Sequence, residues 1–243
     1  MIFDDGYQYG LGAFETVAVY KSKPIFISEH LQRLNKSLSF LGIKQYITED
    51  ELNPYLTKDS PDYYALKILV SEKNILINKR DIPYRSIDYN NGFKMEYSKI
   101  KRNNTSPLVL HKTLNYGECI IEKRRAGEMN INEIIFLNLK DEICEGTTCN
   151  IFFIKNKTIY TPKISCGILP GIIRNYICKT YPVKETIITP KEISDFDECF
   201  VTNSLMSIMP VHRLADKIFE NNKICNKISQ DYFVNILGGY TPL

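Results

Sequence analysis

The stretch Glu145-Gly-Thr-Thr-Cys-Asn-Ile-Phe152 places a polar turn directly before an apolar run. Ile151 to Ile154 and Thr158 to Tyr160 are predicted to form a hairpin around Asn156, because two strand-forming segments flank a short polar turn. Upstream, Glu133 to Leu139 has the composition of another strand. Glu145 therefore follows one predicted strand and precedes the next.

Outward from this stretch, further strands alternate with occasional helices. The predicted strands are Ala13 to Tyr20, Ile25 to Ile27 after a turn at Lys21 to Pro24, Tyr64 to Ser71, Ile75 to Asn78, Phe93 to Tyr97 and Glu198 to Asn203. A helix is predicted from Asn115 to Ala126, closed by Gly127, and a second helix opens at the turn Gly167 to Arg174.

One helix of the first half has a clear apolar stripe. Ser28 is a suitable N-cap and Gly42 a suitable end. The stripe consists of Leu31, Leu34, Leu38 and Leu41. Arg33 lies beside this stripe, not opposite it.

These elements indicate an α+β protein of two domains. The polar segment Lys99 to Pro107 contains the best candidate boundary. We expect a small N-terminal α+β domain over residues 1–103, a linker over 104–110, and a C-terminal domain over 111–243.

The composition narrows the class of protein. The 243 residues are 44% hydrophobic and 24% charged, which is ordinary for a globular chain. A net charge of +3 with scattered basic residues does not indicate a nucleic-acid partner. No apolar run approaches the roughly 20 residues that cross a bilayer, and the N-terminus does not resemble a signal peptide. We therefore expect a cytoplasmic protein that binds neither nucleic acid nor membrane.

The cysteines do not indicate disulfides or a metal. Their odd number and wide spread favour reduced thiols. They are Cys119, Cys144, Cys149, Cys166, Cys178, Cys199 and Cys225. Because no second pair or nearby histidine accompanies Cys144 and Cys149, we predict no metal site.

Four local features could carry chemistry. Lys112 is either a solvated charge or, if its amine is partly desolvated, a lysine able to form a Schiff base. Glu145 is either an exposed acid or a carboxylate that keeps a pyridine nitrogen protonated. Gly171 to Ile173 begins a helix whose free N–H groups can bind phosphate, although plain turns look the same. Arg33 is either a surface charge or the partner of that phosphate.

Taken together, six segments resemble the fold type IV pyridoxal-phosphate enzymes. This family includes branched-chain and D-amino acid aminotransferases and aminodeoxychorismate lyases. The segments are Tyr9 to Thr16, Glu29 to Leu34, Lys112 to Asn115, Glu145 to Phe152, Leu169 to Arg174 and Thr202 to Val211. The resemblance covers nearly the whole chain and implies a small N-terminal domain, a larger β-rich pseudo-barrel domain and a homodimer with its active site between the domains.

The resemblance also implies a role for each matching position. Lys112 matches the lysine that carries pyridoxal 5'-phosphate, Glu145 the partner of its ring nitrogen, and Arg33 the phosphate-binding arginine. Further phosphate contacts are implied at Ile172, Ile173 and Ser204. Many transaminases have threonine in place of Ile173, so here only the backbone contact remains. They often have a tyrosine where this chain has Gly117; Tyr116 is one residue early and receives no role.

Within the family, three features favour aminodeoxychorismate lyase. Asn203 to Val211 is most similar to the lyase form of its motif, Thr16 matches a lyase threonine, and the hydrophobic Ile173 follows the lyase pattern. The first domain also lacks the Arg-x-His pair of D-amino acid transaminases. The implied reaction converts 4-amino-4-deoxychorismate to 4-aminobenzoate and pyruvate for folate biosynthesis.

The lyase reaction gives these residues specific tasks. Lys112, displaced by the substrate amine, is the natural general base, and Thr16 is expected to guide protonation of the leaving group. The substrate is a small molecule with two carboxylates, for which Lys67 is the first candidate contact and Arg80 a weaker one, since a surface charge also explains it. Asn203 is expected to hold a polar group of the substrate.

Two alternatives remain open. An aminotransferase acting on D- or branched-chain amino acids would use the same Lys112, Glu145 and Arg33, but would require a keto-acid acceptor. A non-catalytic binding module that keeps the fold would have no need of Lys112 and Glu145 and would lack visible absorbance when purified.

Overall fold

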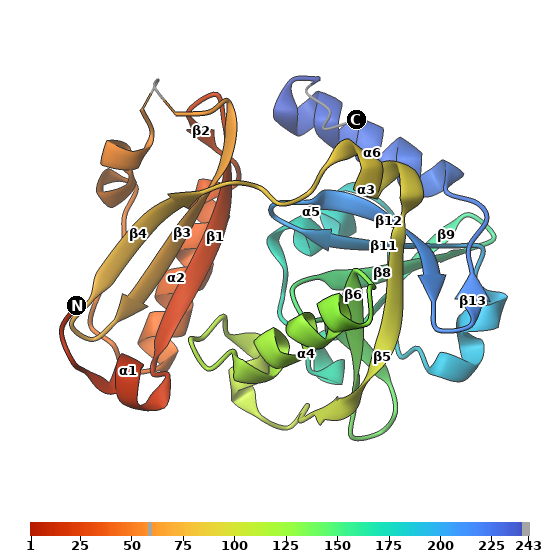
Figure 1. Ribbon diagram of the computed structural model, residues 1–243, viewed down its shortest axis with the longest axis horizontal. Helices are drawn as coiled ribbons and strands as arrows, with labels where there is room; N and C mark the ends of the chain where they lie inside the picture. Colours follow the sequence, from red (N-terminus) through yellow and green to blue (C-terminus); the bar gives the residue numbers. More distant parts are fainter. Residues whose placement is uncertain (58–59, 240–243) are drawn as a thin grey trace. The chain divides into compact units, whose positions relative to one another are not determined.

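The computed structural model describes residues 1–57 and 60–239 and divides into two compact units (Figure 1). Unit 1 consists of Met1–Pro83 together with His111–Tyr116. Unit 2 consists of Tyr84–Leu110 together with the chain from Gly117 onward. Each unit has its own sheet.

Unit 1 is a four-stranded antiparallel sheet with α2 packed on one face (Figure 1). The strand order is β2-β1-β3-β4. Its elements are α1 (Asp5–Tyr9), β1 (Gly12–Tyr20), β2 (Lys23–Pro24), α2 (Ile27–Phe40), the 3-10 helix Asp50–Tyr55, β3 (Tyr63–Ser71) and β4 (Ile75–Arg80). Strands β1, β3 and β4 confirm the strands predicted at Ala13 to Tyr20, Tyr64 to Ser71 and Ile75 to Asn78. Helix α2 confirms the leucine stripe, of which Leu31, Leu34 and Leu38 are buried.

The alternation of side chains along β1 separates the two faces of this sheet. Ala13, Val17 and Val19 are buried in the core that α2 covers. Phe14 and Thr16 point to the opposite face, where the register pairs Thr16 with Lys67 of β3. Thr16 and Lys67, both predicted site residues, therefore lie on the face that α2 does not cover.

The predicted strand Ile25 to Ile27 is wrong. Strand β2 is only Lys23–Pro24, since it pairs two residues with β1, and Ile27 already begins α2. The residue at the N-cap is Phe26, with φ 53°, rather than Ser28.

Unit 2 is built on a nine-stranded mixed sheet that curves strongly (Figure 1). The order is β10-β9-β8-β11-β12-β5-β6-β7, with β13 added to β12. The strands are β5 (Phe93–Arg102), β6 (Glu133–Asn138), β7 (Ile143–Gly146), β8 (Asn150–Lys155), β9 (Thr158–Pro162), β10 (Val183–Thr186), β11 (Glu198–Asn203), β12 (Ser207–Leu214) and β13 (Lys217–Ile218). The helices are α3 (Ser86–Asn91), α4 (Gly117–Glu128), α5 (Ile172–Thr180) and α6 (Lys223–Leu237), with short 3-10 helices at Pro107–Leu110, Ile164–Cys166 and Pro190–Asp195. The α+β class and the hairpin around Asn156 are confirmed.

The division into units differs from the boundary that the sequence predicted at residues 104–110. Strand β5 belongs to unit 2 because it pairs with β12 on one side and β6 on the other. The segment His111–Tyr116 belongs to unit 1 because Thr113 forms an antiparallel bridge with Ala13. Helix α4 begins at Gly117, two residues later than predicted, and continues through Gly127.

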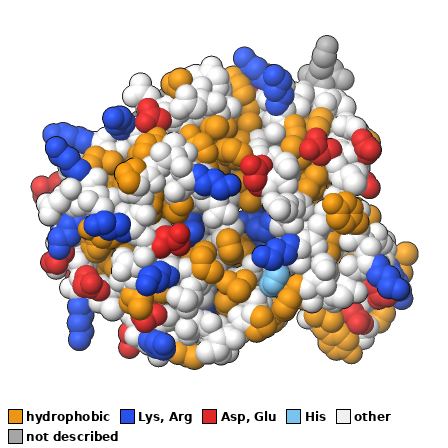
Figure 2. Space-filling model, turned by 180° about the vertical axis from the view of Figure 1, so that it is seen from behind, with side chains coloured by type: hydrophobic (Ala, Val, Ile, Leu, Met, Phe, Trp, Pro, Cys, Tyr) orange, Lys and Arg blue, Asp and Glu red, His pale blue; other side chains and the backbone are white. Residues whose placement is uncertain are grey.

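The surface shown in Figure 2 carries basic and acidic side chains that are interspersed rather than gathered by sign. Among the described residues, no helix is both long enough and apolar enough to cross a membrane.

Candidate functional site

In unit 1, two lysine side chains approach one aromatic ring. Nζ of Lys67 lies 3.4 Å from the ring centroid of Phe14, and Nζ of Lys112 lies 4.5 Å from the same centroid. Tyr116 packs edge-on against Phe14 and is 5.5 Å from Nζ of Lys112. Aromatic faces attract cations, so this arrangement gathers two amines on the sheet face opposite α2.

Close backbone packing holds Lys112 beside β1. The carbonyl of Lys112 accepts from the N–H of Phe14 at 2.9 Å, and the N–H of Leu114 donates to the carbonyl of Gly12 at 2.8 Å. A Cβ at Gly12 would lie 2.5 Å from Leu114 Cδ1 and 2.6 Å from the carbonyl oxygen of Val70, so only glycine allows this approach. The predicted motif around Gly12 therefore positions the lysine.

The electrostatics of this face act most strongly on Lys67. Burial, together with the charges of Lys112 and Arg80, lowers the pKa of Lys67 to about 7, while Glu15 acts in the opposite direction. The register places Arg80 on the same sheet face as Lys67, although its side chain is exposed. Thr16 lies directly opposite Lys67. Four of the predicted site residues, Thr16, Lys67, Arg80 and Lys112, thus belong to one face of unit 1.

The other face contains a buried ionic cluster that sequence reasoning missed. Glu15 is fully buried and accepts from Arg33 Nε at 2.6 Å and Nη2 at 2.8 Å. Nδ1 of His30 lies 2.7 Å from Oε2 of Glu15. The sequence does contain an indication of this cluster, because Glu15 alternates with Ala13 and Val17 on the apolar face of its strand. An acid at such a position requires a cationic partner.

The cluster fixes the charge states of its members. Burial alone would raise the pKa of the Glu15 carboxyl, but the charge of Arg33 and the contact with His30 hold that pKa well below its usual range. Burial lowers the pKa of His30 against the opposing effect of Glu15, so a neutral imidazole donates to an ionised carboxylate. The hydrogen bonds from Nε and Nη2 to Glu15 orient the guanidinium of Arg33.

In unit 2, Glu145 is a buried carboxylate at the end of β7. Its Oε1 accepts from Arg102 Nη2 at 2.5 Å. Its Oε2 accepts from Asn150 Nδ2 at 3.2 Å and from the N–H of Leu169 at 3.0 Å. Donors on both oxygens favour the ionised form of the carboxylate, which is the form that can accept a hydrogen bond from a protonated ring nitrogen.

The same network reaches the start of α5. The amide of Asn150 also donates to the carbonyl of Leu169 at 3.0 Å, and the N-cap of α5, Gly171, has no side-chain cap hydrogen bond. The side chains of Ile172 and Ile173 are buried, so only their backbone N–H groups can serve a ligand. A helix start of this kind is suited to an anion.

An orphaned polar atom lies in the strand beside Asn150. Thr202 is 1% exposed, and its Oγ is one of the buried polar atoms in the described part of the chain that lack a hydrogen-bond partner. The register pairs Thr202 with Asn150, and Ser204 follows just beyond the end of β11. An ionised carboxylate, an uncapped helix start and a buried hydroxyl without a partner fit a phosphorylated pyridine.

Asn203, the predicted contact for a polar group of the substrate, makes several hydrogen bonds within unit 2. Its amide nitrogen donates to Tyr84 Oη at 3.1 Å and to the carbonyl of Thr148 at 3.2 Å. Its Oδ1 accepts from the N–H groups of Leu205 and Met206, both at 2.9 Å. These four contacts hold the turn after β11, and the contact of Asn203 with the substrate stays a prediction.

Replacing Gly171 with alanine is expected to weaken retention of a bound phosphorylated cofactor and to lower stability by about 1–3 kcal/mol. The new Cβ would lie 1.9 Å from Oδ1 of Asn150 and would displace this amide, whose Nδ2 donates to Glu145 and to the carbonyl of Leu169. Cofactor retention on dialysis and thermal melting measure the two effects. Gly127→Ala is the matched control, because that helical glycine is exposed and has nothing within 4 Å of a Cβ. Equal retention by both variants would contradict the expectation.

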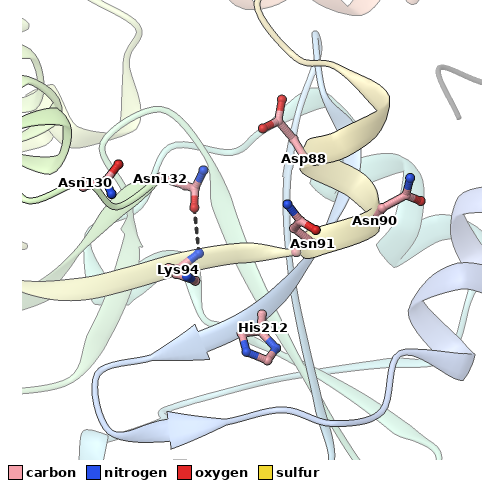
Figure 3. A pocket seen from close by; sticks show the side chains of 8 residues that line it. Asp88, Asn90, Asn91, Lys94, Asn130, Asn132 and His212 are labelled. Atoms are coloured by element: carbon pink, nitrogen blue, oxygen red, sulfur yellow. Dashed lines mark hydrogen bonds between the residues drawn. The ribbon is translucent and has the colours of Figure 1, made fainter.

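A separate hollow in unit 2 does not coincide with these residues. It has a volume of about 670 Å³ and lies between α3, the start of β5, the turn before β6 and β12 (Figure 3). Its lining is polar and consists of Asp88, Asn90, Asn91, Gly92, Lys94, Asn130, Asn132 and His212. None of the predicted site residues lines it.

Comparison with known families and proteins agrees with the resemblance of the motifs. The family model described as amino-transferase class IV matches residues 12–214. The aminodeoxychorismate lyase of Bacillus subtilis is 28% identical over 238 residues, which cover 88% of this chain and 81% of that protein. A candidate branched-chain-amino-acid aminotransferase of Thermotoga maritima is 26% identical over 220 residues, with coverages of 85% and 78%.

A solved structure extends the comparison to the fold. The crystal structure of a candidate 4-amino-4-deoxychorismate lyase from Legionella pneumophila superimposes with a TM-score of 0.83 at 30% sequence identity. The match covers 94% of this chain and 92% of that chain.

Proposed function

The chain belongs to the class IV aminotransferase family of pyridoxal-phosphate enzymes, and within it we propose that it is an aminodeoxychorismate lyase. The proposed reaction converts 4-amino-4-deoxychorismate to 4-aminobenzoate and pyruvate, a step of folate biosynthesis. The observation that carries the proposal is the cationic sheet face of unit 1, where Lys67 lies opposite Thr16 and shares the Phe14 ring with Lys112. A substrate with two carboxylates is suited to such a face.

The residues would divide the work as follows. Lys112 would carry the cofactor, and its amine, freed when the substrate binds, would remove the proton from the carbon that bears the substrate amine. Glu145 would accept a hydrogen bond from the ring nitrogen. Arg33, oriented by Glu15, would neutralise the phosphate. The backbone N–H groups of Ile172 and Ile173 and the hydroxyl of Ser204 are the remaining proposed phosphate contacts.

The bound cofactor supplies an electron sink. The side chains govern where protons move. Lys112, which is half-buried, would act as the base, and the hydroxyl of Thr16 is proposed to guide a proton to the departing enolpyruvyl oxygen. Departure leaves an aromatic ring, which makes the step strongly favourable. Because nothing is transferred to a second substrate, no keto acid is needed.

The proposed contact between Lys67 and a substrate carboxylate predicts a pH dependence. Below pH 7 the Lys67 amine is charged, and above pH 7 it becomes neutral, because its pKa in the free protein is about 7. We therefore expect kcat/KM for the dicarboxylate substrate to fall as the pH rises through about 7. The expected increase in KM on Lys67→Met is about tenfold to a hundredfold at pH 6.5.

The control for this pH profile is Lys67→Arg, whose guanidinium does not titrate in this range and should flatten the fall above pH 7. Lys79→Arg serves as a second control, since Lys79 of β4 is bonded to Thr57 and Ser60. A wild-type profile that Lys67→Arg leaves unchanged would exclude Lys67 as the titrating contact.

We also propose that the protein acts as a cytoplasmic homodimer. Large apolar side chains are exposed at the N-terminus of unit 1, where Phe3 is 64%, Tyr7 71% and Tyr9 66% exposed. The rings of Phe3 and Tyr7 also pack together, with centroids 5.6 Å apart, and exposed apolar side chains that cluster favour a protein–protein contact. Sedimentation of the purified protein, with Tyr7→Glu as the disrupting variant, measures the assembly.

The second candidate is an aminotransferase, favoured by the relative from Thermotoga maritima. Lys112, Glu145 and Arg33 would serve it equally. The test is to supply 4-amino-4-deoxychorismate without any keto acid and to measure both products. Equimolar 4-aminobenzoate and pyruvate over many turnovers support the lyase. Absence of product, with D- or L-amino acids converting the bound cofactor to its amine form, would replace the lyase by the aminotransferase.

A further inference from the structure

The guanidinium of Arg102, at the end of β5, lies in a largely apolar setting within unit 2. Its side chain is 14% exposed, and its Cζ is 4.8 Å from the ring centroid of Phe136. Nη1 donates to Sγ of Cys119 at 3.6 Å, which is a weak contact, and Nε is buried without a hydrogen-bond partner. Among the described residues, Glu145 therefore provides the one strong polar contact of this guanidinium, at 2.5 Å from Nη2.

The contacts of Glu145 are divided between its two oxygens. Arg102 occupies Oε1, whereas Asn150 and the N–H of Leu169 occupy Oε2. Neutral N–H donors stabilise the ionised carboxylate less strongly than a cation does. The arginine thus adds a charge that Asn150 and Leu169 cannot supply.

We propose that Arg102 is a positioning residue that acts through Glu145, holding this carboxylate ionised so that the proton it shares with the cofactor's ring nitrogen stays on the ring. The inference rests on the proposed role of Glu145 as the partner of that nitrogen. No sequence motif among the six pointed to Arg102.

The effect of Arg102 on the proton depends on how far each of two possible proton positions lies from its guanidinium. A proton on the Glu145 carboxyl would lie within the same ion pair as the Arg102 guanidinium. A proton on the ring nitrogen would be farther from the guanidinium, because the nitrogen is proposed to bond to Glu145 and not to Arg102. The positive charge of Arg102 therefore disfavours the first position more than the second. An adjacent cation shifts a carboxyl equilibrium by about tenfold to a thousandfold, so its removal should change the proton distribution by at least about tenfold.

If the ion pair only stabilised the fold, removing Arg102 would not change the protonation of the ring nitrogen. A buried pair is often replaceable by apolar side chains without loss of stability. Arg125 of α4 offers a matched comparison in the same unit, because it pairs with Glu122 at 2.8 Å and also has a buried Nε without a partner. Its partner carboxylate is not among the proposed cofactor contacts.

The experiment uses the holoenzyme loaded with pyridoxal phosphate that carries nitrogen-15 in its ring. The ring-nitrogen chemical shift reports its protonation directly. We expect a protonated ring in the wild type and in Arg125→Gln, and a ratio of protonated to neutral ring lower by about tenfold or more in Arg102→Gln. An Arg102→Gln shift identical to that of the wild type would overturn the proposal.

A second variant keeps the test decisive if Arg102→Gln does not fold. In Arg102→Lys the introduced amine retains a charge at neutral pH but loses it at high pH, which an arginine does not. The ring should then lose its proton as that amine titrates, at a lower pH than in the wild type. Superimposable high-pH profiles would contradict the proposal.

Glu145→Gln separates failure of this inference from failure of the underlying role. If Glu145→Gln leaves the ring protonated, Glu145 is not the partner of the nitrogen, and the proposed role itself is wrong. If Glu145→Gln neutralises the ring while both Arg102 variants behave as the wild type, only the inference about Arg102 is wrong.

Discussion

Lys112→Ala is expected to lower turnover by about four orders of magnitude or more, because one side chain both carries the cofactor and moves the proton. The fold should persist, since the Lys112 segment is held to β1 by backbone hydrogen bonds from Phe14 and to Gly12. Product formation under substrate saturation measures the first effect, and circular dichroism and melting of the variant measure the second.

The appropriate control for this loss is a lysine of the same sheet that lies outside the proposed site. Lys79→Ala removes an amine from β4, bonded to Thr57 and Ser60, and should leave turnover near that of the wild type. Near-normal turnover of Lys112→Ala would exclude Lys112 as the cofactor lysine, whatever the control shows.

Glu15→Gln is expected to destabilise the protein by about 3–5 kcal/mol, the usual cost of removing one partner from a buried ion pair. Glutamine fills the same space but leaves the charge of Arg33, which is 13% exposed, without its counterion. Urea denaturation of the apoprotein measures the change without a contribution from cofactor loss. Glu72→Gln is the matched control, since Glu72 is exposed in the same unit.

The same pair predicts how the difference depends on pH. The pKa of Glu15 is lowered on folding, so the ion pair stabilises the protein at pH values above the ordinary glutamate pKa of 4.5, and this contribution is lost as the pH falls below it. The gap between wild type and Glu15→Gln should therefore narrow in acid. A double variant, Glu15→Gln with Arg33→Gln, should lose less than the sum of the single changes. Additive losses would show that the two side chains act independently.

Strong local patterns made much of the fold predictable. In α2 and in β1 one face is buried, and the periodic apolar residues of each segment indicate that face. These residues are the leucine stripe of α2 and Ala13, Val17 and Val19 of β1. The sequence predicted strand β5 but not the unit to which it belongs. Its pairing with β6 and β12 depends on segments far away in the chain. The division of the chain at Tyr84 cannot be read from local composition.

The site was predictable in its motifs but not in its supporting contacts. Lys112 and Glu145 stand in recognisable segments. Phe14, which receives two lysines, looks like an ordinary apolar strand residue in the sequence. Arg102 lies 43 residues before Glu145, and nothing in the intervening chain relates the two. Such pairs arise from strand order, which is a property of the folded sheet.

Which lysine is bonded to the cofactor can be tested directly. Lys67 and Lys112 both approach Phe14, and Lys67 has the lowered pKa, about 7, that favours an unprotonated amine. Reduction of the holoenzyme with borohydride, followed by peptide mapping by mass spectrometry, identifies the lysine bonded to pyridoxal phosphate. We expect the cofactor on the peptide that contains Lys112. The cofactor on the Lys67 peptide, or on no lysine at all, would contradict it.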